Sequence, residues 1–192
     1  MSQGVDKWDA RYADTAETPP ARVLLENAHL LPRGGVALDL ACGLGANALL
    51  LASRGFEVFA WDSSGVAIDK LRTLARARGL TLQAEVRDVV RHPPEPGRFD
   101  VIVVSHFLNR NLAPHLIAAL RAEGLLFYQT FTRSRVGECG PHNPDYLLAD
   151  GELLVMFSPL QPMVYRDEGP VGTIDQGFRG QALLVARKAI SR

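Results

Sequence analysis

Cysteine is scarce in this sequence: only Cys42 and Cys139 occur, and they do not form the closely spaced pair of a metal site. We therefore expect no disulfide scaffold and no bound metal, with a reducing compartment as the default. A surplus of either charge is also missing, because 21 Lys and Arg residues balance 21 Asp and Glu residues. Without a basic surplus, nucleic acid and anionic membrane surfaces lose their main attraction. We expect neither as a partner, and a small-molecule substrate instead.

Long apolar segments are missing as well. No apolar run is long enough to cross a bilayer, and residues 1–18 are polar without the apolar centre of a signal peptide. We therefore expect a cytoplasmic protein, either a monomer or a homodimer. Its 192 residues suit a single domain. We divide this domain into an N-terminal lid and helical segment, residues 1–34, and a core, residues 35–192.

From residue 35 onward, short apolar runs alternate with segments of helical periodicity. The predicted strands occupy residues 36–41, 56–61, 80–86, 99–105 and 125–130. The predicted helices occupy residues 46–54, the stretch between Ser64 and Gly79, and residues 112–121 and 150–157. Two further strand-like runs, 160–166 and 181–187, follow without a long helix between them. This order predicts an α/β three-layer sandwich with a mostly parallel seven-stranded sheet and an antiparallel C-terminal edge hairpin.

The predicted strand ends carry glycines and acidic residues, and ligands of parallel sheets bind beyond those ends. The first strand runs into residues 39–45, Asp-Leu-Ala-Cys-Gly-Leu-Gly. Gly43 and Gly45 let the backbone approach a ligand closely, beside the free N–H groups of a helix N-terminus. Asp62 ends the second strand, where a carboxylate can accept both hydroxyls of a ribose. Asp88 ends the third, where the carboxylate or its backbone neighbour can meet an adenine amino group.

The glycines alone leave two cofactors open. Residues 43–48, Gly-Leu-Gly-Ala-Asn-Ala, also fit the fingerprint of NAD(P)-dependent oxidoreductases. Asp39 separates the two interpretations. A pyrophosphate gains nothing from a carboxylate there, whereas the ammonium group of S-adenosylmethionine can be held by it, usually through water. The chain also lacks room for a separate substrate domain, which favours the methyl donor.

The motif over residues 39–45 resembles motif I of the class I S-adenosylmethionine-dependent methyltransferases, with Ala41 where many members carry glycine. Asp62 and Asp88 match the acidic positions after the second and third strands of that family. The resemblance covers nearly the whole chain and is closest to the tellurite-resistance branch of small methyltransferases. Three further segments of the sequence are similar to that branch: residues 8–12, 127–132 and 140–154. The resemblance implies a Rossmann-like fold, S-adenosylmethionine as the cofactor and methyl transfer to a small acceptor, such as a chalcogen or thiol species.

The predicted cofactor site combines the strand ends with an N-terminal lid in which Arg11 pairs with the cofactor carboxylate. Plain structural roles stay open: Asp62 can cap a helix, and the aromatic rings of residues 8–12 can pack on the core. Cys42 is interpreted as a small space-filling residue. The predicted cofactor-binding residues are Trp8, Arg11, Asp39, Ala41, Gly43, Gly45, Asp62, Ser63, Asp88, Val89 and Ser105.

His106 is the candidate catalytic residue, because it follows the fourth strand, where donor and acceptor would meet. It can act as a general base, contact the sulfonium through its backbone, or merely pack. Arg110, Arg133 and His142 are the candidate residues for an anionic acceptor, although each is also an ordinary surface group. A non-catalytic module that binds S-adenosylmethionine stays open as a third hypothesis.

Overall fold

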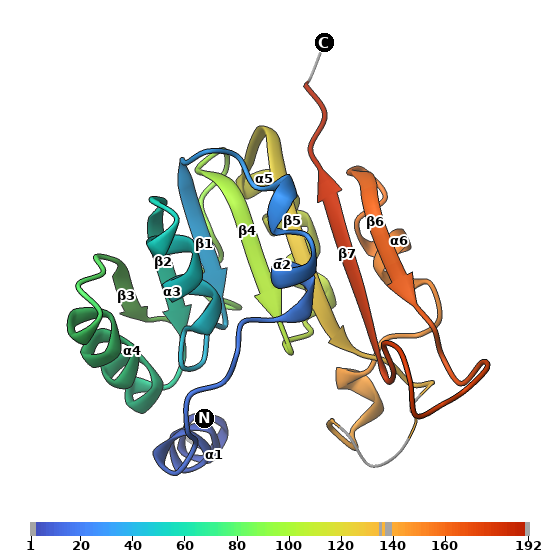
Figure 1. Ribbon diagram of the computed structural model, residues 1–192, viewed down its shortest axis with the longest axis horizontal. Helices are drawn as coiled ribbons and strands as arrows, with labels where there is room; N and C mark the ends of the chain where they lie inside the picture. The colour runs from blue at the N-terminus through green and yellow to red at the C-terminus, as the bar shows by residue number, and fades with distance from the viewer. Residues whose placement is uncertain (1–2, 135, 137–139, 191–192) are drawn as a thin grey trace.

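A seven-stranded sheet lies between two layers of helices in the computed structural model, which describes residues 3–134, 136 and 140–190 (Figure 1). Cys139 lies outside the described residues. The strand order is β3-β2-β1-β4-β5-β7-β6. The strands are β1 (Val36–Leu40), β2 (Glu57–Asp62), β3 (Gln83–Val86), β4 (Phe99–Ser105), β5 (Leu120–Phe131), β6 (Gln161–Asp167) and β7 (Gln181–Arg187).

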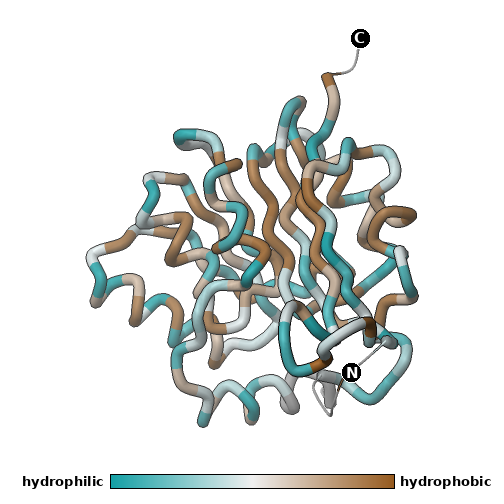
Figure 2. The backbone as a smooth tube through the Cα atoms, turned by 45° about the vertical axis from the view of Figure 1, so that its right-hand side comes forward, coloured by the Kyte–Doolittle hydropathy of each residue, from teal (hydrophilic) through white to brown (hydrophobic). Residues whose placement is uncertain are grey.

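The pairing pattern divides the sheet into a parallel part and an antiparallel edge. β1 lies between β2 and β4, with Leu38 opposite Phe59 of β2 and Ile102 of β4 in parallel register. β7 runs antiparallel to both β5 and β6, so this strand lies between two strands that precede it in the chain. The central strands are the most apolar part of the backbone trace (Figure 2). The predicted parallel sheet with an antiparallel C-terminal hairpin is therefore confirmed.

Two apolar cores, one on each face of the sheet, hold the helices in place. Side chains alternate along β4, so Val101 and Val103 face one core while Ile102 and Val104 face the other. α2, α3 and α4 cover the first core, and α5 and α6 cover the second. No helix among the described residues is both long and apolar enough to cross a membrane. The helices are α1 (Gln3–Ala13), α2 (Arg22–Glu26), η1 (Ala28–Leu30), α3 (Ala46–Ser53), α4 (Gly65–Ala77), η2 (Arg110–Leu112), α5 (Ala113–Ala119), η3 (Pro144–Tyr146) and α6 (Glu152–Met156).

The boundary between α5 and β5 differs from the prediction. The helix predicted over residues 112–121 ends at Ala119, and the strand predicted from residue 125 begins at Leu120. Leu120 pairs with Phe99 of β4, after which the register shifts around an irregularity that holds Glu123 at a φ of 64°. Pairing with β4 therefore overrides the helical periodicity of this stretch, because a strand neighbour is invisible to a local pattern.

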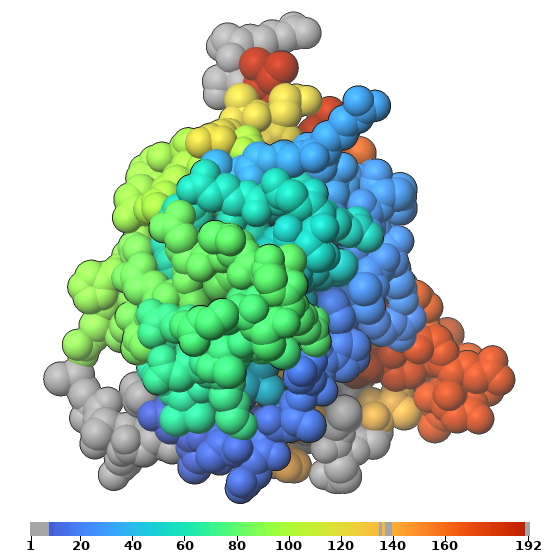
Figure 3. All heavy atoms as spheres, turned by 60° about the vertical axis from the view of Figure 1, so that its left-hand side comes forward, coloured from blue at the N-terminus to red at the C-terminus, as the bar shows by residue number. Residues whose placement is uncertain are grey.

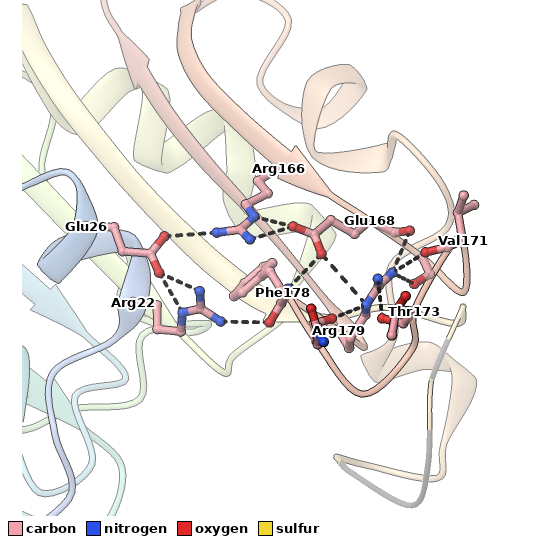
Figure 4. Close-up of polar contacts among 11 residues, drawn as sticks. Arg22, Glu26, Arg166, Glu168, Val171, Thr173, Phe178 and Arg179 are labelled. Atoms are coloured by element: carbon pink, nitrogen blue, oxygen red, sulfur yellow. Dashed lines mark hydrogen bonds and ion pairs between the residues drawn. The ribbon is translucent and has the colours of Figure 1, made fainter.

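The loop between β6 and β7 is organised around the side chain of Arg179 (Figure 4). Its guanidinium donates to the carbonyl oxygens of Gly169 at 2.9 Å, Val171 at 2.8 Å, Thr173 at 3.0 Å and Gln176 at 2.6 Å. Backbone carbonyls of an irregular loop need such partners when no ladder satisfies them. The Arg179 side chain thus provides the hydrogen-bond donors that a helix or strand would otherwise provide to these carbonyls.

A second cluster joins this hairpin to α2. Glu168 accepts a hydrogen bond from the Phe178 N–H at 2.8 Å and pairs with Arg166, which in turn contacts Glu26 at 3.3 Å. The guanidinium groups of Arg22 and Arg166 lie 4.9 and 5.5 Å from the Phe178 ring centroid. Phe178 itself is buried in the core beneath α2. The hairpin and the segment before β1 are therefore fixed to each other.

Replacement of Arg179 by alanine should loosen the β6–β7 loop without unfolding the sheet. The loop carbonyls would lose a charged donor, and the expected cost is about 1–3 kcal/mol of unfolding free energy. Amide hydrogen exchange should become faster over residues 168–178 and stay unchanged in β1 and β4. Arg54→Ala is the control, because this exposed arginine donates to one carbonyl only, that of Ala28. Equal stability losses in both variants would contradict the role given to Arg179.

Candidate functional site

The turn between β1 and α3 is built from residues in the left-handed region of backbone conformation. Ala41, Gly43 and Gly45 have φ values of 55°, 53° and 76°. The turn is closed by the Gly45 N–H, which donates to the Cys42 carbonyl oxygen at 2.8 Å. Glycine adopts such φ values freely, whereas alanine is strained there. This explains physically why glycine suits the position that Ala41 occupies in this chain.

Asp39 lies beneath this turn and is completely buried. Its carboxylate accepts hydrogen bonds from the Ala48 N–H at 3.0 Å and from the Asn47 side-chain amide at 3.3 Å. Burial raises the pKa of Asp39 to about 7, and these two hydrogen bonds oppose the rise only in part. Because none of its surface is exposed, Asp39 has no atom that a ligand outside the turn can contact directly.

Asn47 connects Asp39 to two other parts of the site. Its amide nitrogen also donates to the Ser105 hydroxyl at 3.1 Å, at the end of β4. Its amide oxygen accepts from the backbone N–H of Ala21 at 2.8 Å, just before α2. Asn47 is itself buried, so these protein partners replace water at both its side-chain oxygen and its side-chain nitrogen. The ends of β1 and β4 and the segment before α2 therefore meet at one side-chain amide.

Asp62 connects the glycine turn to the start of α4. One carboxylate oxygen accepts from the Gly43 N–H at 2.8 Å, and the other accepts from the Ser64 N–H at 2.9 Å. Ser64, not Asp62, caps α4, because its hydroxyl accepts from the Ala67 N–H at 3.1 Å. Burial raises the pKa of Asp62 above its ordinary value. A carboxylate offers about four acceptor positions, and the backbone N–H groups of Gly43, Ser63 and Ser64 use three of them, so one acceptor position stays available.

The third strand end presents an exposed carboxylate and a buried valine. Asp88 accepts from the N–H groups of Val90 at 3.1 Å and Arg91 at 3.2 Å, so it caps its own turn. Val89 is buried in the core on the α5 side of the sheet. Ser63 is half-buried next to Asp62. The predicted contacts of Asp88, Val89 and Ser63 with an adenosine group stay predictions.

α1 lies beyond the carboxyl ends of the strands and packs on α4 (Figure 1; Figure 3). Asp9 accepts from the Ser64 hydroxyl at 2.5 Å, next to Asp62. Lys70 of α4 donates to the carbonyl oxygens of Tyr12 and Ala13, both at 2.6 Å. These contacts fix both the middle and the end of α1. The predicted lid therefore contains a helix that is hydrogen-bonded to the N-cap residue of α4 and to Lys70 within α4.

Two aromatic rings of α1 lie near the glycine turn. The rings of Trp8 and Tyr12 stack with centroids 5.9 Å apart, and the Arg11 guanidinium lies 5.5 Å from the Trp8 centroid. The Tyr12 hydroxyl comes so near to Gly43 that a Cβ placed there would lie 2.8 Å from it. Gly43 therefore faces a narrow space between the turn and the lid, in which any side chain would be an obstruction.

His106 lies at the end of β4, as predicted, and has an unusual backbone. Its φ is 56°, and its N–H donates to the Gln129 carbonyl oxygen at 2.8 Å. The ring lies 5.1 Å from the Phe131 ring, and its Nε2 atom is 3.2 Å from the Gln181 side-chain oxygen. The surrounding protein atoms lower the pKa of His106, and the positive charge of Arg11 adds to this effect. The lid residue Arg11 is therefore close enough to His106 for its charge to affect the pKa of the ring.

Of the residues predicted to hold an acceptor, Arg110 and Arg133 both act on the Glu152 carboxylate and lower its pKa. Arg110 is committed to Glu152, with its Nε atom 2.5 Å from a carboxylate oxygen, and to the carbonyl oxygens of Asp145 at 2.7 Å and Leu147 at 3.0 Å. These contacts tie Arg110 to the segment before α6, and its predicted role in binding an acceptor stays a prediction. Arg133 and the imidazole of residue 142 are exposed. Their predicted role in binding an acceptor stays a prediction.

Several polar residues of the site carry no sequence signal of their own. Asn47 and Gln181 are ordinary residue types without a diagnostic spacing, and Tyr12 and Gln129 are indicated only as members of the segments 8–12 and 127–132. Asn47 gives one indication, since it follows Gly45 by two residues and lies in a helix that is otherwise apolar. The two glutamines lie on strands far apart in the sequence, so only the sheet register places them together.

A hollow of about 610 Å³ lies next to the turn, on the outer face of α3 and α4. The segment before α2, including Pro19 and Pro20, crosses it, and Leu44, Leu49 and Leu74 contribute apolar walls. Of the turn residues 41–45, Leu44 alone lines the hollow, and the acidic residues Asp39, Asp62 and Asp88 do not line it.

Comparisons with known proteins show what the chain is similar to in sequence and in fold. A family profile described as "Methyltransferase domain" matches residues 37–124, which include the glycine turn, Asp62, Asp88 and His106. YqeM from Bacillus subtilis, a candidate methyltransferase, is 27% identical over 122 residues, which is 58% of this chain and 48% of that protein. The chain spans about half or less of the length of the curated relatives that it matches.

Solved structures share the fold over almost the whole chain. An enzyme described by the conversion of a disulfide bond into a thioacetal group during echinomycin biosynthesis is 24% identical, with a TM-score of 0.72 over 97% of this chain and 92% of that one. TehB from Haemophilus influenzae is 22% identical, with a TM-score of 0.68 over 96% of this chain and 66% of that one. The chain has the class I methyltransferase fold. The comparisons support S-adenosylmethionine as the cofactor of this fold.

Replacement of Ala41 by glycine should stabilise this methyltransferase fold. The substitution removes a left-handed strain and adds flexibility to the unfolded chain, for an expected net gain of about 0.5–1 kcal/mol. Thermal unfolding should shift upward by about 2 °C for a chain of this size. The control is Ala52→Gly in α3, where the same chemical change should cost about 1 kcal/mol. A loss of stability in both variants would show that Ala41 is not strained.

Proposed function

We propose that this chain transfers a methyl group from S-adenosylmethionine to a small-molecule acceptor. The observation that carries the proposal is the glycine turn, which is bordered by the carboxylates of Asp39 and Asp62 and closed by the lid helix α1. The family match over the same residues adds to it. The donor is activated by its own positive charge, so the protein mainly has to position the reactants, which is worth about 7–11 kcal/mol.

The residues of the site fit the parts of this cofactor. Gly43 has no Cβ to keep a ligand away from its backbone, and the Tyr12 hydroxyl of the lid borders the position that a Cβ would take. Asp62 has an acceptor position for a ribose hydroxyl, and the charge of Asp39 favours an ammonium group above the turn. Arg11 on the lid suits the cofactor carboxylate. When bound, the cofactor would supply the electrophilic methyl group.

For the acceptor we propose a small chalcogen or thiol species. The resemblance to the tellurite-resistance branch favours this class, and two of the structural relatives are described by small molecules, echinomycin and geranyl diphosphate. The balanced charge of the chain gives no attraction to nucleic acid. A cytoplasmic location, as a monomer or homodimer, completes the proposal.

A direct assay distinguishes this proposal from its two alternatives. Incubation with S-adenosylmethionine and a panel of thiol, selenium and tellurium compounds should yield S-adenosylhomocysteine and a methylated product. Thermal stabilisation by NAD or NADP, without any by S-adenosylmethionine, would instead indicate an oxidoreductase. Donor binding without turnover on the whole panel would favour a non-catalytic module.

Replacement of Asp62 by asparagine should weaken the binding of S-adenosylhomocysteine by about tenfold or more. The amide can accept at one atom only, and hydrogen bonds to a charged group contribute about 1.5–3 kcal/mol. Isothermal titration calorimetry measures this change. Asp69→Asn is the matched control, since Asp69 lies exposed on α4 and pairs with Arg72. Unchanged affinity in the Asp62 variant would remove this residue from the site.

The affinity for S-adenosylhomocysteine should also depend on pH through Asp39. Burial raises the pKa of Asp39 to about 7, so the free chain holds a proton there below that pH. A bound ammonium group favours the carboxylate, so binding releases this proton and affinity rises from about pH 5 to pH 7. Free-chain stability has the opposite trend, because folding takes up a proton between the unfolded pKa of about 4 and the folded value.

Calorimetry at pH 6.5 in two buffers of different ionisation enthalpy counts the released protons. Asp39→Asn is the control: the amide still accepts from the Ala48 N–H but has no proton to release. Proton release that persists in this variant would assign the linkage to another group.

A further inference from the structure

A chain of side-chain hydrogen bonds runs from the start of α2 to His106. The backbone N–H of Val23 donates to the Gln129 side-chain oxygen at 2.8 Å. The Gln129 amide nitrogen then donates to the Gln181 side-chain oxygen at 2.7 Å, and this same oxygen lies 3.2 Å from His106 Nε2. Gln129 is buried on β5, and Gln181 begins β7. Three strands and one helix thus contribute to a single chain of contacts.

The Val23 N–H fixes the direction of every hydrogen bond in this series. A backbone N–H can only donate, so the Gln129 atom facing Val23 must be the oxygen. The Gln129 nitrogen therefore faces Gln181 as a donor, and the Gln181 atom that receives it must also be an oxygen. An amide oxygen can only accept, so His106 Nε2 must carry the hydrogen. The protonation site of the ring follows from a backbone group outside the ring.

The same argument leaves His106 Nδ1 as the acceptor of the neutral ring. Within the described part of the chain, Nδ1 makes no hydrogen bond, and the ring is exposed beside Phe131 at the end of β4. The positive φ of His106 and the bond from its N–H to the Gln129 carbonyl fix the backbone beneath the ring. Gln129 therefore holds both the main chain and, through Gln181, the ring.

We propose that Gln129 and Gln181 are positioning residues that hold His106 with its hydrogen on Nε2, so that Nδ1 takes the proton of a protic thiol acceptor. This proposal rests on the proposed function. As the S–H bond of the acceptor breaks, its proton passes to Nδ1 and its electron pair forms the new bond to the methyl carbon. The carbon–sulfur bond of the donor breaks, and the sulfonium becomes a neutral thioether.

The electrostatics around the ring suit this role. Arg11 of the lid is the charged group that acts on His106, and its charge favours the neutral ring. Crowding by protein atoms acts in the same direction, while the bond to Gln181 opposes it. The resting ring is therefore neutral at physiological pH and able to accept a proton.

Nitrogen NMR of the ligand-free chain tests the tautomer directly, without any cofactor or acceptor. The His106 ring should show hydrogen on Nε2 and a bare Nδ1 across the neutral pH range. Gln181→Leu should produce a mixture of the two tautomers, and Gln181→Glu should keep the tautomer but raise the pKa of His106 by about one unit or more. Gln176→Leu and Gln176→Glu are the controls, because Gln176 is exposed in the loop before β7. Hydrogen on Nδ1 in the wild type, or a tautomer ratio that Gln181→Leu leaves unchanged, overturns the proposal.

Kinetics with S-adenosylmethionine and 2-mercaptoethanol as the thiol probe test the role of Nδ1. Loss of a positioned base typically costs about 10²–10⁴-fold in rate. We expect Gln181→Leu to lower kcat by at least about tenfold with little change in the KM of the donor. Gln181→Glu should move the acidic limb of the kcat profile to higher pH, by the same shift that NMR records for the ring. Wild-type kcat in Gln181→Leu, or an unmoved limb in Gln181→Glu, overturns the proposed role.

The two proposals can fail separately. If S-adenosylhomocysteine does not bind the wild type, the proposed function fails, whatever the tautomer is. If S-adenosylhomocysteine binds and 2-mercaptoethanol is methylated, but the ring carries its hydrogen on Nδ1, the proposed positioning of His106 by Gln129 and Gln181 is wrong. The methyltransferase activity then stands.

Discussion

The burial of Asp39 is the constraint on which the rest of the site depends. A carboxylate without contact with water is stable only when protein donors surround it or when it takes up a proton. Here the donors are the Ala48 N–H and the Asn47 amide, both in the first turn of α3. This requirement fixes where α3 begins, and the left-handed turn is the connection that brings it there. The left-handed turn at Gly43 is a consequence of satisfying a buried charge.

Two side-chain amides connect the site to α2. Asn47 satisfies the Ala21 N–H and Gln129 satisfies the Val23 N–H, so the first turn of α2 is held by two residues of the site rather than by a capping side chain. α2 is only a short helix, and such a helix has little stability of its own. Its position is therefore determined by the same residues that organise the ends of β1 and β5. The N-terminal segment, residues 1–34, is therefore attached to the core through Asn47 and Gln129.

Much of the fold was predictable because its signals are local. The run from Gly35 into the glycine turn, the cap at Ser64 and the final strand of residues 181–187 all follow from patterns of neighbouring residues. The acidic strand ends were predictable for the same reason, since parallel strands present their carboxyl ends at one edge. The start of β5 at Leu120 was not, because it depends on pairing with Phe99 across a register shift.

The site was only partly predictable, and its missing members share one property. Gln181 and Gln129 meet through the antiparallel register of β5 and β7, and no sequence pattern encodes that meeting. The ion pair of Arg110 was not predictable for a similar reason, because its partner Glu152 lies in a distant segment. Single charged or amide residues become informative only once their neighbours in space are known. The proposed donor half of the site was predictable because its motifs are compact in sequence, whereas the residues proposed for the acceptor are spread along the chain.

The position of β7 between β5 and β6 has a consequence for how the protein is made. During synthesis, β5 emerges with its outer edge unpaired, and it stays an open edge until the chain has grown past residue 187. A nascent chain that stops earlier exposes an apolar strand that invites pairing with other chains. The same late strand brings Gln181 to His106. Closing the sheet and completing the polar chain to the histidine are therefore one event, and an incompletely synthesised chain has neither.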